Sequence, residues 1–87
     1  MDLKRKKILH RLKRIEGQVR GLQRLIESEA PCVDILVQVS AVTSAMKKTG
    51  CAIVSANMER CLEDALKDRG HSVEDFQKAL VRFIDLA

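Results

Sequence analysis

Two cysteines, one with an amide side chain beside it, are the residues of this chain best suited to chemistry. Cys32 and Cys61 are 29 residues apart, and Asn57 precedes Cys61 by four residues, the spacing at which helical side chains meet. Thiolates bind Cu(I), and without metal they attack disulfides and sulfane sulfur. Asparagine is a poor ligand for soft metals but can hydrogen-bond a thiolate or a polysulfide. The alternative interpretation is two small buried hydrophobes and an amide satisfied by backbone or water.

Both cysteines fall within one predicted helix, from Pro31 to Asp68. At about 1.5 Å and 100° per residue, 29 steps place the two thiols roughly 43 Å apart on the same side of a straight helix. Two such helices packed antiparallel would bring Cys32 of one chain against Cys61 of the other. Their crossing point would lie near Met46 and Lys47. The spacing therefore predicts a site built between subunits, twice per dimer.

Hydrophobic periodicity predicts three helices in all. Apolar residues at spacings of four and three predict a first helix from Leu3 to Ser28. A third helix is predicted from Val73 to Asp85, with its buried side formed by Phe76, Leu80, Phe83 and Ile84. Proline is tolerated in a first helical turn, so the second helix begins at Pro31 despite the interruption at Gly50. The predicted buried stripes are Ile8, Leu12, Ile15, Val19, Leu22 and Ile26, then Leu36, Val39, Met46 and Ile53.

The first-turn position of Cys32 gives its thiolate the positive end of the helix, although Asp34 opposes this effect. Cys32 is therefore expected to be the more acidic thiol. Cys51 lies about 80° away from the line of the other two cysteines, and we assign it to packing. His10 lies among basic residues and His71 in a turn, both remote from the thiols.

The composition predicts a single all-α domain spanning residues 1–87. Hydrophobic residues make up 46% of the chain but aromatic residues only 2%, with one proline and four glycines. So short a chain buries a limited core, and small domains often add a metal, disulfides or partner subunits. No apolar window reaches the 18 or so residues of a membrane span, and no signal core follows the charged start, so we expect a cytoplasmic protein without membrane contact. In that compartment cysteines are ligands or reactive thiols rather than structural disulfides.

No motif of a metabolic enzyme is present. The chain contains no CxxC, phosphate-binding glycine loop, paired carboxylates or Ser/His/Asp set, and no base is placed beside either thiol. We therefore expect a protein that is not an enzyme.

Positive charge gathers in the first third of the chain. Residues 1–24 carry nine positive charges against two negative ones, a net charge of +7, whereas the remaining residues carry −3. This asymmetry indicates a polyanionic partner, nucleic acid above all. A single charge run is more often a solvated helix face, and doubling of the run in a dimer would strengthen the nucleic-acid interpretation. Gly17 and Gly21, four residues apart, could permit close approach of another backbone or of a phosphate.

The run from Arg11 to Gly21, RLKRIEGQVRG, resembles the opening helix of the copper-sensing CsoR and nickel-sensing RcnR repressors. The positions of Cys32 and Cys61 and the stretch from Gln38 to Val42 match as well. The resemblance implies an all-α antiparallel dimer that pairs into a disc-like tetramer. It also implies repression in the inducer-free state without an ordinary helix-turn-helix motif.

Copper sensors of this family use Cys, His and Cys, where this chain has Cys32, Asn57 and Cys61. Two outer positions, Tyr and Glu in copper sensors, read Pro31 and Gln77. The Cys-Asn-Cys pattern resembles the CstR branch, which responds to persulfides and polysulfides. That resemblance implies attack on sulfane sulfur by Cys32 and resolution by Cys61 of the neighbouring subunit into a di-, tri- or tetrasulfide bridge.

The family's DNA contacts map to Arg11 and Arg14 on the first helix and Lys48 on the second, with further phosphate contacts expected at Lys4, Lys7 and Lys13. We therefore predict a repressor of sulfide-detoxification genes that senses sulfane sulfur, needs no cofactor and releases operator DNA when the thiols are cross-linked. The first alternative is a Cu(I) sensor using the same two cysteines. The second is a helical interaction or metal-storage module without a DNA function.

Overall fold

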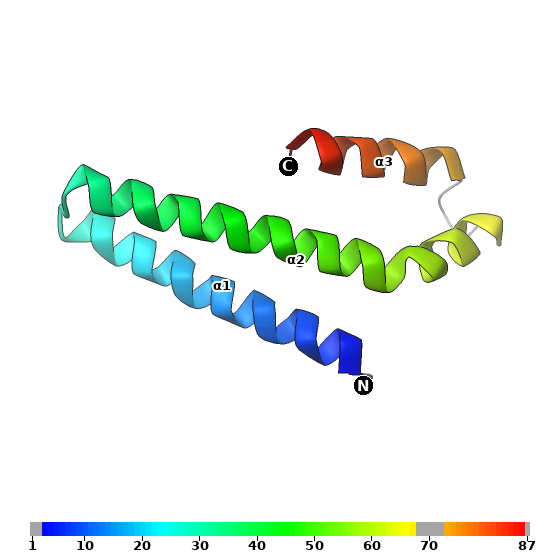
Figure 1. The fold of residues 1–87 in the computed structure, drawn as a ribbon, viewed down its shortest axis with the longest axis horizontal. Coiled ribbons are helices and arrows are strands. Elements are labelled where there is room, and N and C mark those ends of the chain that lie inside the picture. The colour runs from blue at the N-terminus through cyan, green and yellow to red at the C-terminus, as the bar shows by residue number, and fades with distance from the viewer. Residues whose placement is uncertain (1–2, 68–72, 87) are drawn as a thin grey trace. The chain divides into compact units, whose positions relative to one another are not determined.

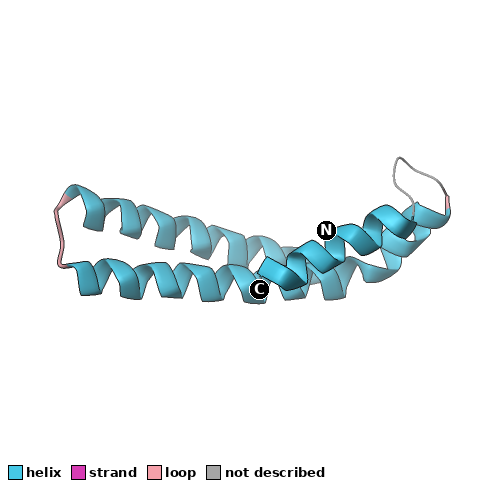
Figure 2. Cartoon of the chain, turned by 90° about the horizontal axis from the view of Figure 1, so that it is seen from above, coloured by secondary structure: helices cyan, strands magenta, loops and turns pink. Residues whose placement is uncertain are grey.

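The chain folds into three α-helices, and the computed structural model describes the backbone of residues 3–67 and 73–86. Helix α1 spans Leu3–Glu27, α2 spans Cys32–Leu66 and α3 spans Val73–Leu86 (Figure 1). Figure 2 shows helices joined by loops, and no strand occurs in the described ranges. The all-α prediction with one very long helix is confirmed, and the helix bounds agree with the predicted ones to within two residues. None of the described helices is apolar enough over a sufficient length to cross a membrane.

Helix α1 ends in a tight turn that fits the sequence Ser28-Glu29-Ala30-Pro31. The amide N–H of Ala30 donates to the Leu25 carbonyl at 3.0 Å, and the Glu29 N–H donates to the Ile26 carbonyl at 3.2 Å. This pair of bonds is a Schellman motif, whose central residue adopts a left-handed conformation. Glu29 has a φ of 53°, in a region that glycine occupies more easily than glutamate. The turn sends α2 back along α1.

The chain forms two compact units, residues 1–53 and residues 54–87. In the first unit, α1 and the beginning of α2 form a helical hairpin (Figures 1 and 2). Ile15, 5% exposed, is the one fully buried apolar residue among the described side chains. Thr49 is 1% exposed, and its hydroxyl donates to the Ala45 carbonyl one turn earlier at 2.8 Å. A small core of this kind leaves much of the apolar surface uncovered.

The face of α2 that packs on α1 is not the predicted stripe. Half-buried residues recur every three or four positions at Ile35, Gln38, Val42 and Ala45. The predicted stripe lies beside this face and remains open: Leu36, Val39 and Met46 are 61%, 39% and 47% exposed. The α1 stripe is corrected at Val19 and Ile26, which are also exposed. One helix carries two apolar arcs here, and α1 covers only one of them.

In the second unit, α3 is amphipathic. Phe76, Leu80 and Phe83 are half-buried as predicted, but Ile84 is exposed, against the prediction. Glu74 occupies the first turn, where acid suits the helix dipole, and pairs with Lys78 at 3.3 Å on the exposed surface. His71 lies outside the described residues.

Candidate functional site

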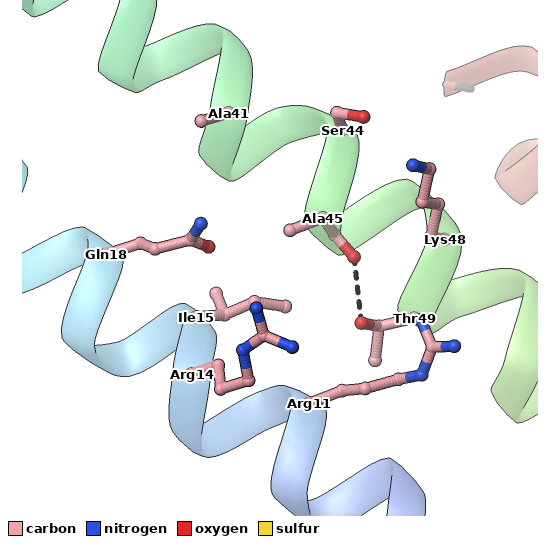
Figure 3. Close-up of a pocket in the computed structure, with 9 residues that line it drawn as sticks. All are labelled: Arg11, Arg14, Ile15, Gln18, Ala41, Ser44, Ala45, Lys48 and Thr49. Carbon is pink, nitrogen blue, oxygen red and sulfur yellow. Dashed lines mark hydrogen bonds between the residues drawn. The ribbon is translucent and has the colours of Figure 1, made fainter.

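A basic pocket of about 320 Å³ lies between α1 and the first half of α2. Residues spaced by three and four positions bring their side chains to its wall from both helices (Figure 3). Arg11 and Arg14 come from α1, and Lys48 comes from α2. The remaining lining residues are Ile15, Gln18, Ala41, Ser44, Ala45 and Thr49.

The positive charges of this pocket are not offset by an acidic side chain in the part of the chain that the structure describes. Within the described ranges, no carboxylate pairs with Arg11, Arg14 or Lys48. Guanidinium groups present a planar fork of N–H donors that matches phosphate oxygens, and lysine adds a point charge. The pocket is therefore suited to a phosphate group.

A second basic groove of about 560 Å³ shares Arg11 and Arg14 with the first and extends along α1 through Lys6, Lys7 and His10. The basic surface is thus continuous over more than two turns of α1. Lys4 and Lys13 are also exposed on α1, but they line neither cavity. Of the six predicted DNA contacts, the structure brings together Arg11, Arg14, Lys48 and Lys7.

Gln18 and Ser44 line the pocket but were missed from the sequence. Gln18 follows Arg14 by four residues, and Ser44 precedes Lys48 by four, so each lies one turn from a predicted contact. That spacing is a usable signal, but the sequence alone did not show that the two helix faces meet.

The thiol site is described in part. Cys32 is the first residue of α2 and its side chain is exposed, next to the Pro31 carbonyl that accepts from the Asp34 N–H at 3.0 Å. Asn57 is half-buried in α2, and Cys61 belongs to the same helix, but the Cys61 side chain lies outside the described residues. Cys51, predicted to serve packing, is exposed.

The residues described in one chain do not gather three metal-binding side chains of the His, Cys, Asp or Glu type. The donors that the sequence offers are two soft thiolates, which suit Cu(I). The 29-residue spacing predicts that the second thiolate comes from a second chain.

A mainly apolar groove of about 490 Å³ lies on the other side of Ile15. It joins Leu12 and Val19 of α1 to Met46 of α2, with Glu16, Arg20 and Gln23 at its rim. Exposed Val39 and Leu36 continue this apolar surface along α2. The residues predicted to meet a second copy, near Met46, are therefore open in the single chain.

Comparison with known proteins gives consistent matches over most of the chain. A family model described as "Metal-sensitive transcriptional repressor" matches residues 4–82. The copper-sensing transcriptional repressor CsoR of Bacillus subtilis (strain 168) is 43% identical over 79 residues, covering 91% of this chain and 73% of that protein. The copper-sensing transcriptional repressor RicR of Mycobacterium tuberculosis (strain H37Rv) is 42% identical over 60 residues, covering 69% of this chain and 62% of that protein.

Two solved structures are also similar. The copper-sensing repressor CsoR with Cu(I) from Geobacillus thermodenitrificans NG80-2 has a TM-score of 0.68 at 38% identity, covering 92% of this chain and 81% of that one. The nickel-responsive transcriptional regulator InrS has a TM-score of 0.67 at 31% identity, covering 95% and 93% of the two chains.

Proposed function

The chain belongs to the family of metal-sensitive transcriptional repressors, and from this membership we propose that it holds operator DNA in its α1–α2 pocket until an inducer acts on its thiols. It is a transcriptional repressor of the CsoR type and not an enzyme. The observation that carries the proposal is the convergence of Arg11, Arg14 and Lys48 from two helices on one pocket.

DNA binding follows from the charge of this pocket. A backbone phosphate entering it accepts N–H bonds from Arg11 and Arg14 and meets the ammonium group of Lys48. Each neutralised phosphate releases counterions and contributes about −0.9 to the slope of log K against log salt. Lys7 and His10 in the adjoining groove would meet the next part of the backbone, with Lys4 and Lys13 contributing at longer range. Contacts of this kind fix position, so DNA shape supplies the sequence preference.

We propose Cu(I) as the inducer, bound between Cys32 of one chain and Cys61 of a second. Relatives over 40% identical are named copper-sensing, and a solved neighbour contains Cu(I). Two thiolates suit this soft ion, and its binding would tie the first turn of α2 to the partner's α2. The arrangement that results binds DNA poorly. Because two thiolates can hold Cu(I) by themselves, the site can respond to copper without a histidine.

Sulfane sulfur is the second candidate inducer, because Asn57 stands where copper sensors carry histidine. In this mechanism, the Cys32 thiolate attacks a polysulfide, breaks an S–S bond and becomes a persulfide while the shortened polysulfide leaves. The Cys61 thiolate of the partner then attacks the Cys32 sulfur atom, expels hydrosulfide and leaves a disulfide. The similar repressors carry copper in their names, so this candidate stands behind the first.

The antiparallel dimer and the tetramer built from it belong to the same proposal. The open surface around Met46 supports pairing of α2 with α2 of a second copy, because apolar surface of this extent favours burial. The alternative of an interaction or metal-storage module without a DNA function gains no support from the family.

The deciding experiment exposes the reduced, DNA-bound protein to Cu(I) buffered by a chelator and, separately, to an inorganic polysulfide, without oxygen. We expect Cu(I) to release the DNA at one ion per thiol pair, with the monomer mass unchanged. Release by polysulfide, with a covalent disulfide-linked dimer, would instead establish the second candidate. Release by neither reagent would end the sensing proposal.

A Cys32→Ser variant tests the thiol assignment itself. We expect complete loss of the response to the inducer, while DNA affinity changes by less than about twofold because Cys32 lies outside the basic pocket. The comparison variant is Cys51→Ser, which should respond normally. A normal response from Cys32→Ser would assign sensing to another residue.

A further inference from the structure

A hydrogen bond between a side chain and the backbone crosses from α2 to α1 beside the basic pocket. Gln38 of α2 donates from Nε2 to the main-chain carbonyl of Gln18 in α1, at 3.0 Å, in a half-buried place. The two residues are twenty positions apart, so this bond joins the helices rather than stabilising one of them. It is directional, whereas apolar packing permits sliding.

Gly21 lies against this bond. A Cβ atom at position 21 would lie 3.4 Å from the Gln38 Nε2 atom, and longer side chains would need the space that the amide occupies. Gly17, four residues earlier on the same helix, meets nothing within 4 Å of such an atom. The two glycines, which look equivalent in the sequence, therefore have different surroundings.

The bonded residue is itself part of the pocket wall. The Gln18 side chain lines the pocket with Arg14 and Lys48, and its Oε1 atom is buried without a hydrogen-bond partner (Figure 3). The Gln38 bond therefore fixes the backbone of α1 four residues beyond Arg14. A slide of one helical turn would move Arg14 by about 5.4 Å relative to Lys48, too far for both to hold one phosphate.

We propose that Gln38 is a positioning residue for DNA binding: its bond to the Gln18 carbonyl, beside Gly21, holds α1 in the register in which Arg11, Arg14 and Lys48 converge on one phosphate. Gln38 does not line the pocket. Ile15 is the only fully buried apolar residue among the described side chains, so apolar packing constrains the register of the hairpin weakly. The directional bond from Gln38 adds the constraint that packing lacks. The inference rests on the proposed role of the pocket.

A double-mutant cycle tests this role, with operator affinity measured at several salt concentrations on the full chain. Gln38→Leu keeps the size of the side chain and removes the donor, so we expect a loss of roughly five- to tenfold, the worth of one hydrogen bond. The salt slope should become shallower by about 0.9 for each phosphate that the protein no longer neutralises. In an Arg14→Ala background, Gln38→Leu should cost clearly less than in the parent chain, because one of the side chains that it positions is already gone. Additive losses would overturn the inference and leave Gln38 a merely structural residue.

A glycine pair provides the independent variant and its matched control. Gly21→Leu and Gly17→Leu raise helix propensity equally, so neither should unfold α1. We expect Gly21→Leu to reproduce the affinity loss and the shallower slope, and Gly17→Leu to match the parent chain. Equal affinities for the two variants would contradict the inference, even if Gln38→Leu failed to fold.

The same measurements distinguish failure of the DNA pocket from failure of the positioning role. If Arg14→Ala leaves operator affinity and salt slope unchanged, the proposed DNA pocket is wrong. If Arg14→Ala weakens binding while Gln38→Leu and Gly21→Leu do not, only the positioning role is wrong.

Discussion

The two sides of the α1–α2 hairpin differ in what they can bind, although only Ile15 separates them. One side gathers Arg11, Arg14 and Lys48 around a polar pocket. The other exposes Val19 and Met46 in a groove with little net charge. The cationic side repels another copy of itself and attracts a polyanion, whereas the apolar side gains by covering itself with protein. A two-helix unit can thus serve DNA and self-association at once without sharing a surface.

A substitution at Met46 should disturb the apolar side of the hairpin most strongly. A Met46→Asp substitution places a carboxylate in the apolar groove, where pairing with a second copy would bury two like charges near the predicted crossing point. Since burying an unpaired charge costs several kcal/mol, we expect the dimer to weaken at least about 100-fold, and operator binding to be lost with it. Sedimentation at micromolar concentration measures the first effect and a gel-shift assay the second.

Met46→Leu is the control for this prediction, because it keeps the apolar surface and a similar volume. It should sediment as the parent chain does. A Met46→Asp variant that still forms the same oligomer would show that the apolar side is not the surface on which copies meet.

On the cationic side, Arg14→Ala should have a smaller effect, and on DNA binding alone. We expect operator affinity to fall roughly tenfold at low salt, with the salt slope shallower by about 0.9 for each phosphate left without its cation, and the oligomeric state to remain unchanged. Fluorescence anisotropy over a salt series measures both affinity and slope. Lys13→Ala removes the same charge from an exposed residue outside both basic cavities, and its effect should be clearly smaller. Equal effects would mean that total charge matters and the pocket does not.

A substitution in the turn between α1 and α2 should change neither DNA binding nor self-association. Glu29 adopts a φ of 53°, so Glu29→Gly relieves a strained conformation and should raise the free energy of unfolding by about 1 kcal/mol. DNA affinity and oligomeric state should stay as they are. Chemical denaturation measures the change, and Glu27→Gly, in the last turn of α1, should lower stability instead. A loss of stability in Glu29→Gly would mean that the glutamate side chain contributes more than its strain costs.

The helices themselves could be predicted well from the sequence. Pro31 fixes the beginning of α2, and the short polar turn before it fixes the end of α1, because these residues act locally. The basic surface was also predictable, since Arg11 and Arg14 are neighbours on one helix and their charges need no partner to be recognised.

The choice of packing face could not be predicted in the same way. Helix α2 carries one apolar arc through Ile35, Val42 and Ala45 and another through Leu36 and Met46, and periodicity does not rank them. The predicted stripe follows the second arc, but α1 covers the first. The predicted pairing of Cys32 with Cys61 of a second chain stays a prediction, since it depends on how two copies meet.

Long-range polar interactions were the hardest features to predict from the sequence. Gln38 and Gln18 look like solvated amides in the sequence, and only the spatial arrangement of α1 and α2 shows that one reaches the backbone of the other. Thr49, a polar residue with 1% exposure, was missed for a related reason: its hydroxyl is satisfied within its own helix, which permits burial without a partner elsewhere.

The uncovered apolar arc of α2 has a consequence for the cell. For a repressor that works as pairs of chains, the number of pairs falls with the square of chain abundance at low levels, and unpaired chains are the less stable ones that proteases remove first. Dilution by growth would then lift repression more steeply than in proportion to the protein lost. Such a protein must be expressed above a threshold concentration. If it repressed its own gene too strongly, repression would be lost abruptly rather than gradually.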